Sequence, residues 1–137
     1  MSTVALRDTY PWLPGAGQVW NIEAGVYWDA VRVAAVFGRG TSAALGGACG
    51  AVILDAWSQT MYFLVDPSDK TPLDIPEAQR FGTATYVTVP SLRSAKAGPH
   101  WLRGPDFERL WTPLDALQAA LRRGVTAIAG PRAKAGR

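Results

Sequence analysis

A glycine pattern followed by an acid is the feature of this sequence that comes nearest to a ligand-binding motif. Gly38 and Gly40 follow an apolar segment, Ala43 completes the G-x-G-x-x-G/A pattern, and Asp55 comes 17 residues after Gly38. In dinucleotide-binding folds such glycines let backbone N–H groups at a helix start hold a pyrophosphate, while the acid binds a ribose. The intervening helix would be short, and the chain has no room for a second mononucleotide half. A small nucleotide-binding enzyme built on Gly38, Gly40 and Asp55 is therefore one hypothesis, and a tight turn in a glycine-rich sequence is the alternative.

The other residue types that perform catalysis are sparse. His100 is the only histidine, so any Ser-His-Asp or histidine-based metal site would depend on it. It stands between Pro99 and Trp101 in a short expected strand, where a structural histidine is the alternative to a general base. No phosphate-loop lysine motif, H-E-x-x-H, G-x-S-x-G or C-x-x-C motif occurs. We therefore name no catalytic residue and expect no metal and no cofactor.

Tryptophans next to arginines suggest a second kind of function. Proteins that bind single-stranded nucleic acid stack bases on aromatic side chains and place cations beside them. Strand alternation puts Trp28 on the same face as Arg32, and Trp101 on the same face as Arg103. A nucleic-acid-binding protein using these four residues and a basic C-terminal tail is one hypothesis, and packing of the tryptophans in the core is the alternative.

The remaining tryptophans favour contact with another protein. Trp12 and Trp20 lie in residues 1–24, whose prolines and glycines predict an extended N-terminal arm, and Trp57 is expected at the tip of a hairpin. Aromatic side chains at such exposed places are typical of interfaces, although the arm tryptophans could instead cap the domain's own core. Our leading hypothesis is a non-enzymatic, cytoplasmic protein-interaction or regulatory module that forms a homodimer or binds another protein.

The elements that would position these residues form one α+β domain over residues 25–123. Its centre is a predicted hairpin of two apolar runs, residues 51–55 and 61–65, which lack clean alternation and so should be covered on both faces. Further strands are predicted at 25–34, 83–90 and 100–103, and residues 67–82 as a surface excursion. One helix should begin at Thr41 or Ser42, and the other, capped by Thr112, should end at Gly124. The prediction is an α+β fold with a four- to five-stranded, mostly antiparallel sheet and two covering helices.

Charge and composition place the chain among ordinary single domains. The formal net charge is +3, and residues 122–137 contain five basic residues and no acid, so the rest of the chain is nearly neutral. Residues 124–137 are predicted to be a flexible basic tail. Cys49 is the only cysteine, and no apolar run has the length of a signal peptide core or a membrane span. We therefore expect a cytoplasmic protein without membrane contact.

Five segments carry a resemblance to a known family. They are residues 26–33, 50–57, 62–67, 85–90 and 100–103. Together they resemble a family of small actinobacterial proteins of uncharacterised activity, over about residues 25 to 121. The resemblance implies no catalytic or cofactor-binding residues.

Overall fold

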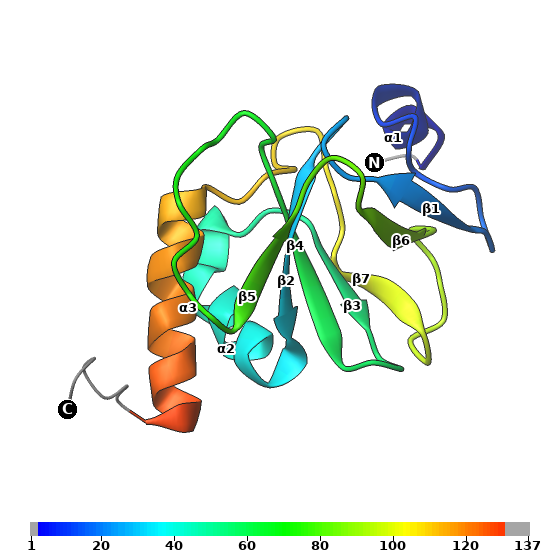
Figure 1. Cartoon of the computed structure of the whole chain (residues 1–137). Coiled ribbons are helices and arrows are strands. Elements are labelled where there is room, and N and C mark those ends of the chain that lie inside the picture. Colours follow the sequence, from blue (N-terminus) through cyan, green and yellow to red (C-terminus); the bar gives the residue numbers. More distant parts are fainter. Residues whose placement is uncertain (1–2, 131–137) are drawn as a thin grey trace.

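A five-stranded antiparallel sheet forms the centre of the molecule (Figure 1). This computed structural model describes residues 3–130. The strand order is β5-β2-β4-β3-β7. The bounds are Asp29–Ala34 for β2, Val52–Asp55 for β3, Thr60–Val65 for β4, Ala78–Phe81 for β5 and Pro99–Arg103 for β7. The predicted α+β class is confirmed, and the predicted central hairpin is the pair β3 and β4.

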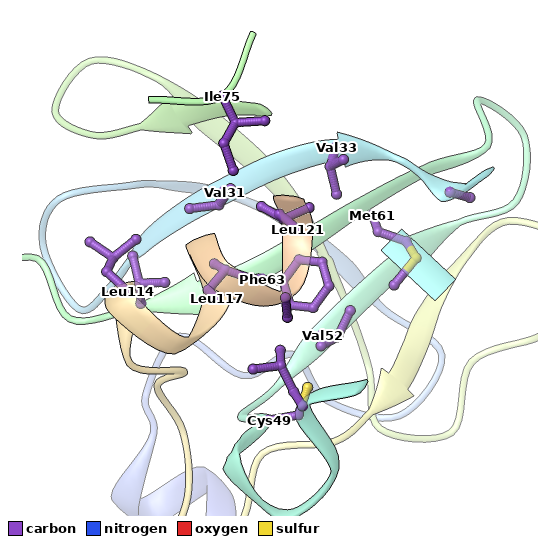
Figure 2. Close-up of a cluster of buried hydrophobic side chains, with 14 of the residues drawn as sticks. Val31, Val33, Cys49, Val52, Met61, Phe63, Ile75, Leu114, Leu117 and Leu121 are labelled. Carbon is purple, nitrogen blue, oxygen red and sulfur yellow. The ribbon is translucent and has the colours of Figure 1, made fainter. Parts of the chain in front are cut away.

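Two helices cover one face of this sheet. They are α2 (Ala35–Leu45), which continues into a short 3₁₀ turn η1 (Gly46–Ala48), and α3 (Leu114–Ala129). Between them and the sheet lies an apolar core in which Val31, Phe63, Leu117 and Leu121 are almost fully buried (Figure 2). Alternate residues of each strand point to this face, because side chains alternate along a strand.

A smaller layer covers part of the opposite face. It consists of helix α1 (Thr3–Thr9) and a two-stranded antiparallel ribbon of β1 (Val19–Glu23) and β6 (Tyr86–Pro90) (Figure 1). Its side chains meet the sheet in a second apolar core that contains Trp12, Trp28 and Val87. The expectation that the hairpin strands are covered on both faces is therefore confirmed, and this explains why their apolar residues do not alternate.

The N-terminal segment differs from its prediction. Residues 1–24 were expected to form an extended arm, but the described part contains α1 and β1, and Trp12 is only 2% exposed. The ring of Trp12 packs edge-to-face on Trp28 and lies beside Tyr10 and Trp101. Burying an indole of this size outweighs the helix-breaking composition of the segment.

The predicted start of α2 and the predicted end of α3 were wrong. α2 begins at Ala35, directly after β2, so Gly38 and Gly40 lie inside the helix. Gly38 is needed for close packing, since a Cβ there would lie 2.6 Å from Sδ of Met61. α3 continues past Gly124 to Ala129. Gly124 lets the two helices approach closely, since a Cβ there would lie 2.9 Å from Oγ1 of Thr41. The predicted basic tail therefore does not start at residue 124, and residues 131–137 lie outside the described part.

The order of strands gives the connection through α2 a particular geometry. β2 and β3 are both antiparallel to β4, which is inserted between them, so the unit β2-α2-β3 is a split β-α-β motif. β5 was missed by the sequence reading, which gave residues 67–82 as a surface excursion. None of the helices in the part of the chain that the structure describes has the length and hydropathy to cross a membrane.

Candidate functional site

The ribbon and α1 leave the hairpin end of the second sheet face uncovered. Along β2, Trp28 and Ala30 are buried under this layer, whereas Arg32 is exposed; along β4, Leu64 is buried and Tyr62 only half-buried. We call the uncovered region the open strip. It comprises Arg32, Asp55, Trp57, Tyr62 and Phe81. Its floor is made by β2, β4 and β3, with the β3–β4 turn at its end.

Trp57 presents one face of its ring to solvent and rests the other on the backbone. Its side chain is 77% exposed. A Cβ placed on Gly98 would lie 2.9, 3.0 and 3.1 Å from Cζ2, Cη2 and Cε2 of this ring. Nearly equal distances to three consecutive ring atoms place Gly98 over the flat face of the indole and not beyond its edge. The position of Trp57 is further fixed by its backbone N–H, which donates to Oδ1 of Asp55 at 3.0 Å. The indole ring is therefore fixed in position and presents a flat apolar face to solvent.

Tyr62 and Arg32 form the polar part of the strip. They are register partners on adjacent strands, and the ring of Tyr62 packs edge-to-face on Phe81. Burial raises the pKa of the Tyr62 hydroxyl above its ordinary value; the nearby Arg32 guanidinium acts in the opposite direction and the Asp55 carboxylate in the same one. Because the ordinary pKa of tyrosine is already near 10, this hydroxyl stays protonated at neutral pH. It can both donate and accept a hydrogen bond there.

Three exposed cations belong to the segments that flank the strip. Arg32 is on β2, and Arg93 and Lys96 are in the loop that leads into β7. That loop folds back on itself, since the Ser94 hydroxyl donates to the Pro99 carbonyl at 3.2 Å, and Pro99 is the register partner of Asp55. Within residues 3–130 none of these three cations forms an ion pair.

The structure separates the residues predicted to bind nucleic acid. Trp28 is fully buried, so only Arg32 of that pair is accessible. A register shift in β7 breaks the alternation between Trp101 and Arg103: the Trp101 indole N–H donates to the Pro90 carbonyl under the ribbon, while Arg103 donates to the Cys49 carbonyl. The shared face predicted for Trp101 and Arg103 is therefore absent, and on the face that Trp28 shares with Arg32 only Arg32 is accessible.

The nucleotide-binding arrangement is also absent. Gly38 and Gly40 lie within α2, so no glycine-rich loop precedes that helix, and β4 separates the two strands that the motif requires to be neighbours. Asp55 instead fixes the hairpin turn through its contact with Trp57. The difference arises at the start of the helix, which the sequence predicted at Thr41 or Ser42, whereas β2 passes directly into α2 at Ala35.

The protein-contact residues have three different environments. Trp57 is the most exposed large apolar side chain in the described part, Trp20 is half-buried in the ribbon, and Trp12 belongs to the second core. His100 is buried, with Nδ1 at 2.9 Å from the Gly98 carbonyl, so it supports the backbone beneath the Trp57 ring. Residues 3–130 contain no group of three His, Cys, Asp or Glu side chains able to hold a metal ion.

Sequence reasoning missed Tyr62, Phe81 and Gly98. Tyr62 could have been found, because it alternates with Leu64 in a strand already predicted. Gly98 gave no signal, since only the folded chain brings it beneath Trp57. No protein-family model, curated protein or solved structure matched this chain. The resemblance to an actinobacterial family therefore stays a prediction, and the chemistry of the strip must be argued from its own side chains.

Proposed function

We propose that this chain is a non-enzymatic protein-interaction module that binds a partner through the open strip, with Trp57 as the main contact. The observation that carries the proposal is the exposed face of Trp57, held flat against Gly98. Tryptophans are enriched among the residues that dominate binding energy at protein interfaces. A ring that is already fixed loses little conformational entropy on binding.

The surroundings of Trp57 support the same function. Phe81 and Tyr62 add partly exposed aromatic area, and polar groups stand at the margin of the strip, as in the rim of an interface. Within the strip, the Asp55 carboxylate accepts the Trp57 N–H and forms no hydrogen bond with the Tyr62 hydroxyl, so this hydroxyl is not paired with a general base there. We further propose a cytoplasmic location, because the single cysteine, Cys49, is a free thiol.

The experiment is site-specific photo-crosslinking in cells that express the full chain. A photoreactive amino acid replaces Ser58, which is exposed beside Trp57, and in a control chain it replaces Arg123 on α3. We expect a discrete protein adduct from position 58 and not from position 123. Trp57→Ala should reduce that adduct at least tenfold, whereas Trp111→Ala, which removes another exposed tryptophan, should leave it unchanged.

Two results would contradict the proposal. One is an adduct at position 58 that persists in the Trp57→Ala chain; the other is the absence of any adduct that distinguishes position 58 from position 123. Sedimentation of the purified chain, with and without Trp57, identifies the case in which the partner is a second copy. Trp57→Ala should keep the melting temperature of the parent chain, because the side chain of Trp57 is 77% exposed.

A further inference from the structure

The charges of the open strip discriminate among possible partners. Arg32 is on β2, Arg93 and Lys96 are in the loop that leads into β7 beside Asp55, and all three are exposed. If two copies met strip to strip about a two-fold axis, Arg32 of one copy would face the cationic loop of the other. Like charges at an interface oppose association, so a second copy is a poor occupant of this surface.

The three exposed cations favour an anionic partner, and Asp55 distinguishes a nucleic-acid strand from an acidic peptide. Its Oδ1 accepts the Trp57 N–H, and within residues 3–130 its Oδ2 accepts no hydrogen bond. A nucleic-acid strand carries a negative charge at every nucleotide and would bring phosphates next to this carboxylate. A peptide instead carries backbone N–H groups, which can donate to Oδ2, and acidic side chains only at some positions.

The width of the strip sets the spacing that a peptide must have. The strip crosses from β2 to the start of β7, which are three strand spacings apart. With neighbouring strands roughly 4.8 Å apart this is about 14 Å, the length of about four extended residues. Trp57 lies between the two cationic ends, at the turn that joins β3 to β4.

From these observations we infer that the partner of the open strip is an acidic peptide segment. It stacks an aromatic or proline residue on Trp57 and directs acidic side chains toward Arg32 on one side and toward Arg93 and Lys96 on the other. The inference rests on the proposed function and specifies the partner's chemistry. Its acids stand about four residues apart, with the apolar residue between them.

The test is selection of random twelve-residue peptides displayed on phage, using the full chain as bait and its Trp57→Ala variant for counter-selection. Peptides retained only by the parent chain should have a negative net charge and the spacing acid, apolar ring, acid. A synthesised representative should bind at least tenfold more weakly to Trp57→Ala. Its affinity should also fall several-fold when the salt concentration rises from about 50 to about 200 mM, because salt screens the attraction between exposed charges.

A matched pair of charge reversals tests the role of the loop. Lys96→Glu should weaken binding of the acidic peptide at least fivefold, whereas Arg123→Glu, the same type of change on α3, should leave it within twofold. Both side chains are exposed, so neither variant should lose its fold.

Each other result overturns the inference. Selected peptides that are neutral or basic would leave the Trp57 contact in place but remove its acidic partner, as would equal effects of the two reversals. A twelve-nucleotide oligothymidylate that displaces the peptide and binds the parent chain more tightly would assign the strip to single-stranded nucleic acid. If no peptide depends on Trp57, the acidic-peptide inference fails, while the crosslinking experiment still decides the proposed function independently.

Discussion

At the scale of single residues, the two ends of β2 contain charges in opposite situations. Arg32 is exposed at the hairpin end, whereas Asp29 at the other end is buried and paired: Nε of Arg80 on β5 donates to its Oδ2 at 2.8 Å. Arg80 also reaches the carbonyls of Asp66 and Pro67 at 3.3 and 3.4 Å. One guanidinium thus ties β5 to β2 and to the loop after β4.

Removal of this guanidinium should destabilise the protein clearly. Arg80→Ala leaves the Asp29 carboxylate buried without its cation, and we expect the free energy of unfolding to fall by about 1–3 kcal/mol. Urea unfolding followed by circular dichroism measures the change. The double variant Arg80→Ala with Asp29→Asn should recover part of the loss, and a double variant as unstable as the sum of both single variants would refute a direct coupling.

Asp69 is a second residue whose charge matters to the fold. Hydrogen bonds from the hydroxyl and N–H of Thr71, at 2.7 and 3.1 Å, and from the N–H of Leu114 lower the pKa of its carboxyl. Asp69 therefore caps the start of α3, where the N-cap residue Pro113 provides no side-chain hydrogen bond. The predicted cap residue, Thr112, instead accepts a hydrogen bond from the N–H of Gly50.

This arrangement predicts a defined response to acid. Because the carboxyl has a lower pKa in the folded chain than in the unfolded one, its stabilisation is complete at neutral pH and is lost as the pH falls through the lowered pKa. Asp69→Asn should cost about 1 kcal/mol at pH 7, the usual loss for a helix-cap contact. The difference from the parent chain should shrink from about pH 4 downward. A difference independent of pH would show that the charge is not involved.

At the scale of elements, two glycines of α2 have opposite roles. Gly38 faces β4, where a Cβ would lie 2.6 Å from Sδ and 3.2 Å from Cβ of Met61. Around Gly40, apart from its chain neighbours and the backbone of its own helix, no atom lies within 4 Å of the Cβ position. The first glycine is required by helix-to-sheet packing. The second only adds backbone freedom to the unfolded chain.

Alanine at these two positions should change stability in opposite directions. Gly38→Ala overpacks the interface between α2 and β4 and should lower the free energy of unfolding by about 1–3 kcal/mol. Gly40→Ala should raise it by about 0.5–1 kcal/mol, because the helix interior favours alanine. Thermal unfolding of the two variants in parallel provides the measurement, and a loss of stability in Gly40→Ala would contradict the placement of this residue inside a helix.

The elements that were predicted correctly are those whose local apolar pattern is sufficient to define them. The hairpin β3–β4 and the leucine stripe of α3 are apolar over their full length, so local pattern was enough. α2, α1 and β5 were missed or misplaced because tertiary contacts override their composition: Gly38 and Gly124 serve close packing, and Arg80 binds Asp29 across strands. In the candidate site, Trp57 was found because a hairpin tip is exposed, but Gly98 beneath it could not be.

At the scale of the whole molecule, one sheet separates two apolar cores. The core under the helices contains Leu117, the core under the ribbon contains Trp12, and both side chains are almost fully buried. Every sheet strand contributes to at least one core, and β2, β3 and β4 contribute to both through alternate residues. Loss of either core should therefore weaken the same sheet.

Large-to-small variants in the two cores should have coupled effects. Trp12→Ala should cost about 3–5 kcal/mol and Leu117→Ala about 2–5 kcal/mol, through lost burial and the cavities left behind. In both variants, unfolding monitored by near-ultraviolet and far-ultraviolet circular dichroism should remain one coincident transition at a lower urea midpoint. A Trp12→Ala chain in which the near-ultraviolet signal is lost first would mean that the ribbon layer unfolds separately.

The insertion of β4 between β2 and β3 also sets the order in which the sheet can assemble. β3 and β4 are joined by a short turn and can pair rapidly, but β2 reaches its place beside β4 only after the chain of α2 has closed a much longer loop. We therefore expect the transition state for folding to contain the hairpin and the docked α2. Substitutions at Phe63 or Met61 should slow folding, whereas those in β5 or the ribbon should mainly speed unfolding.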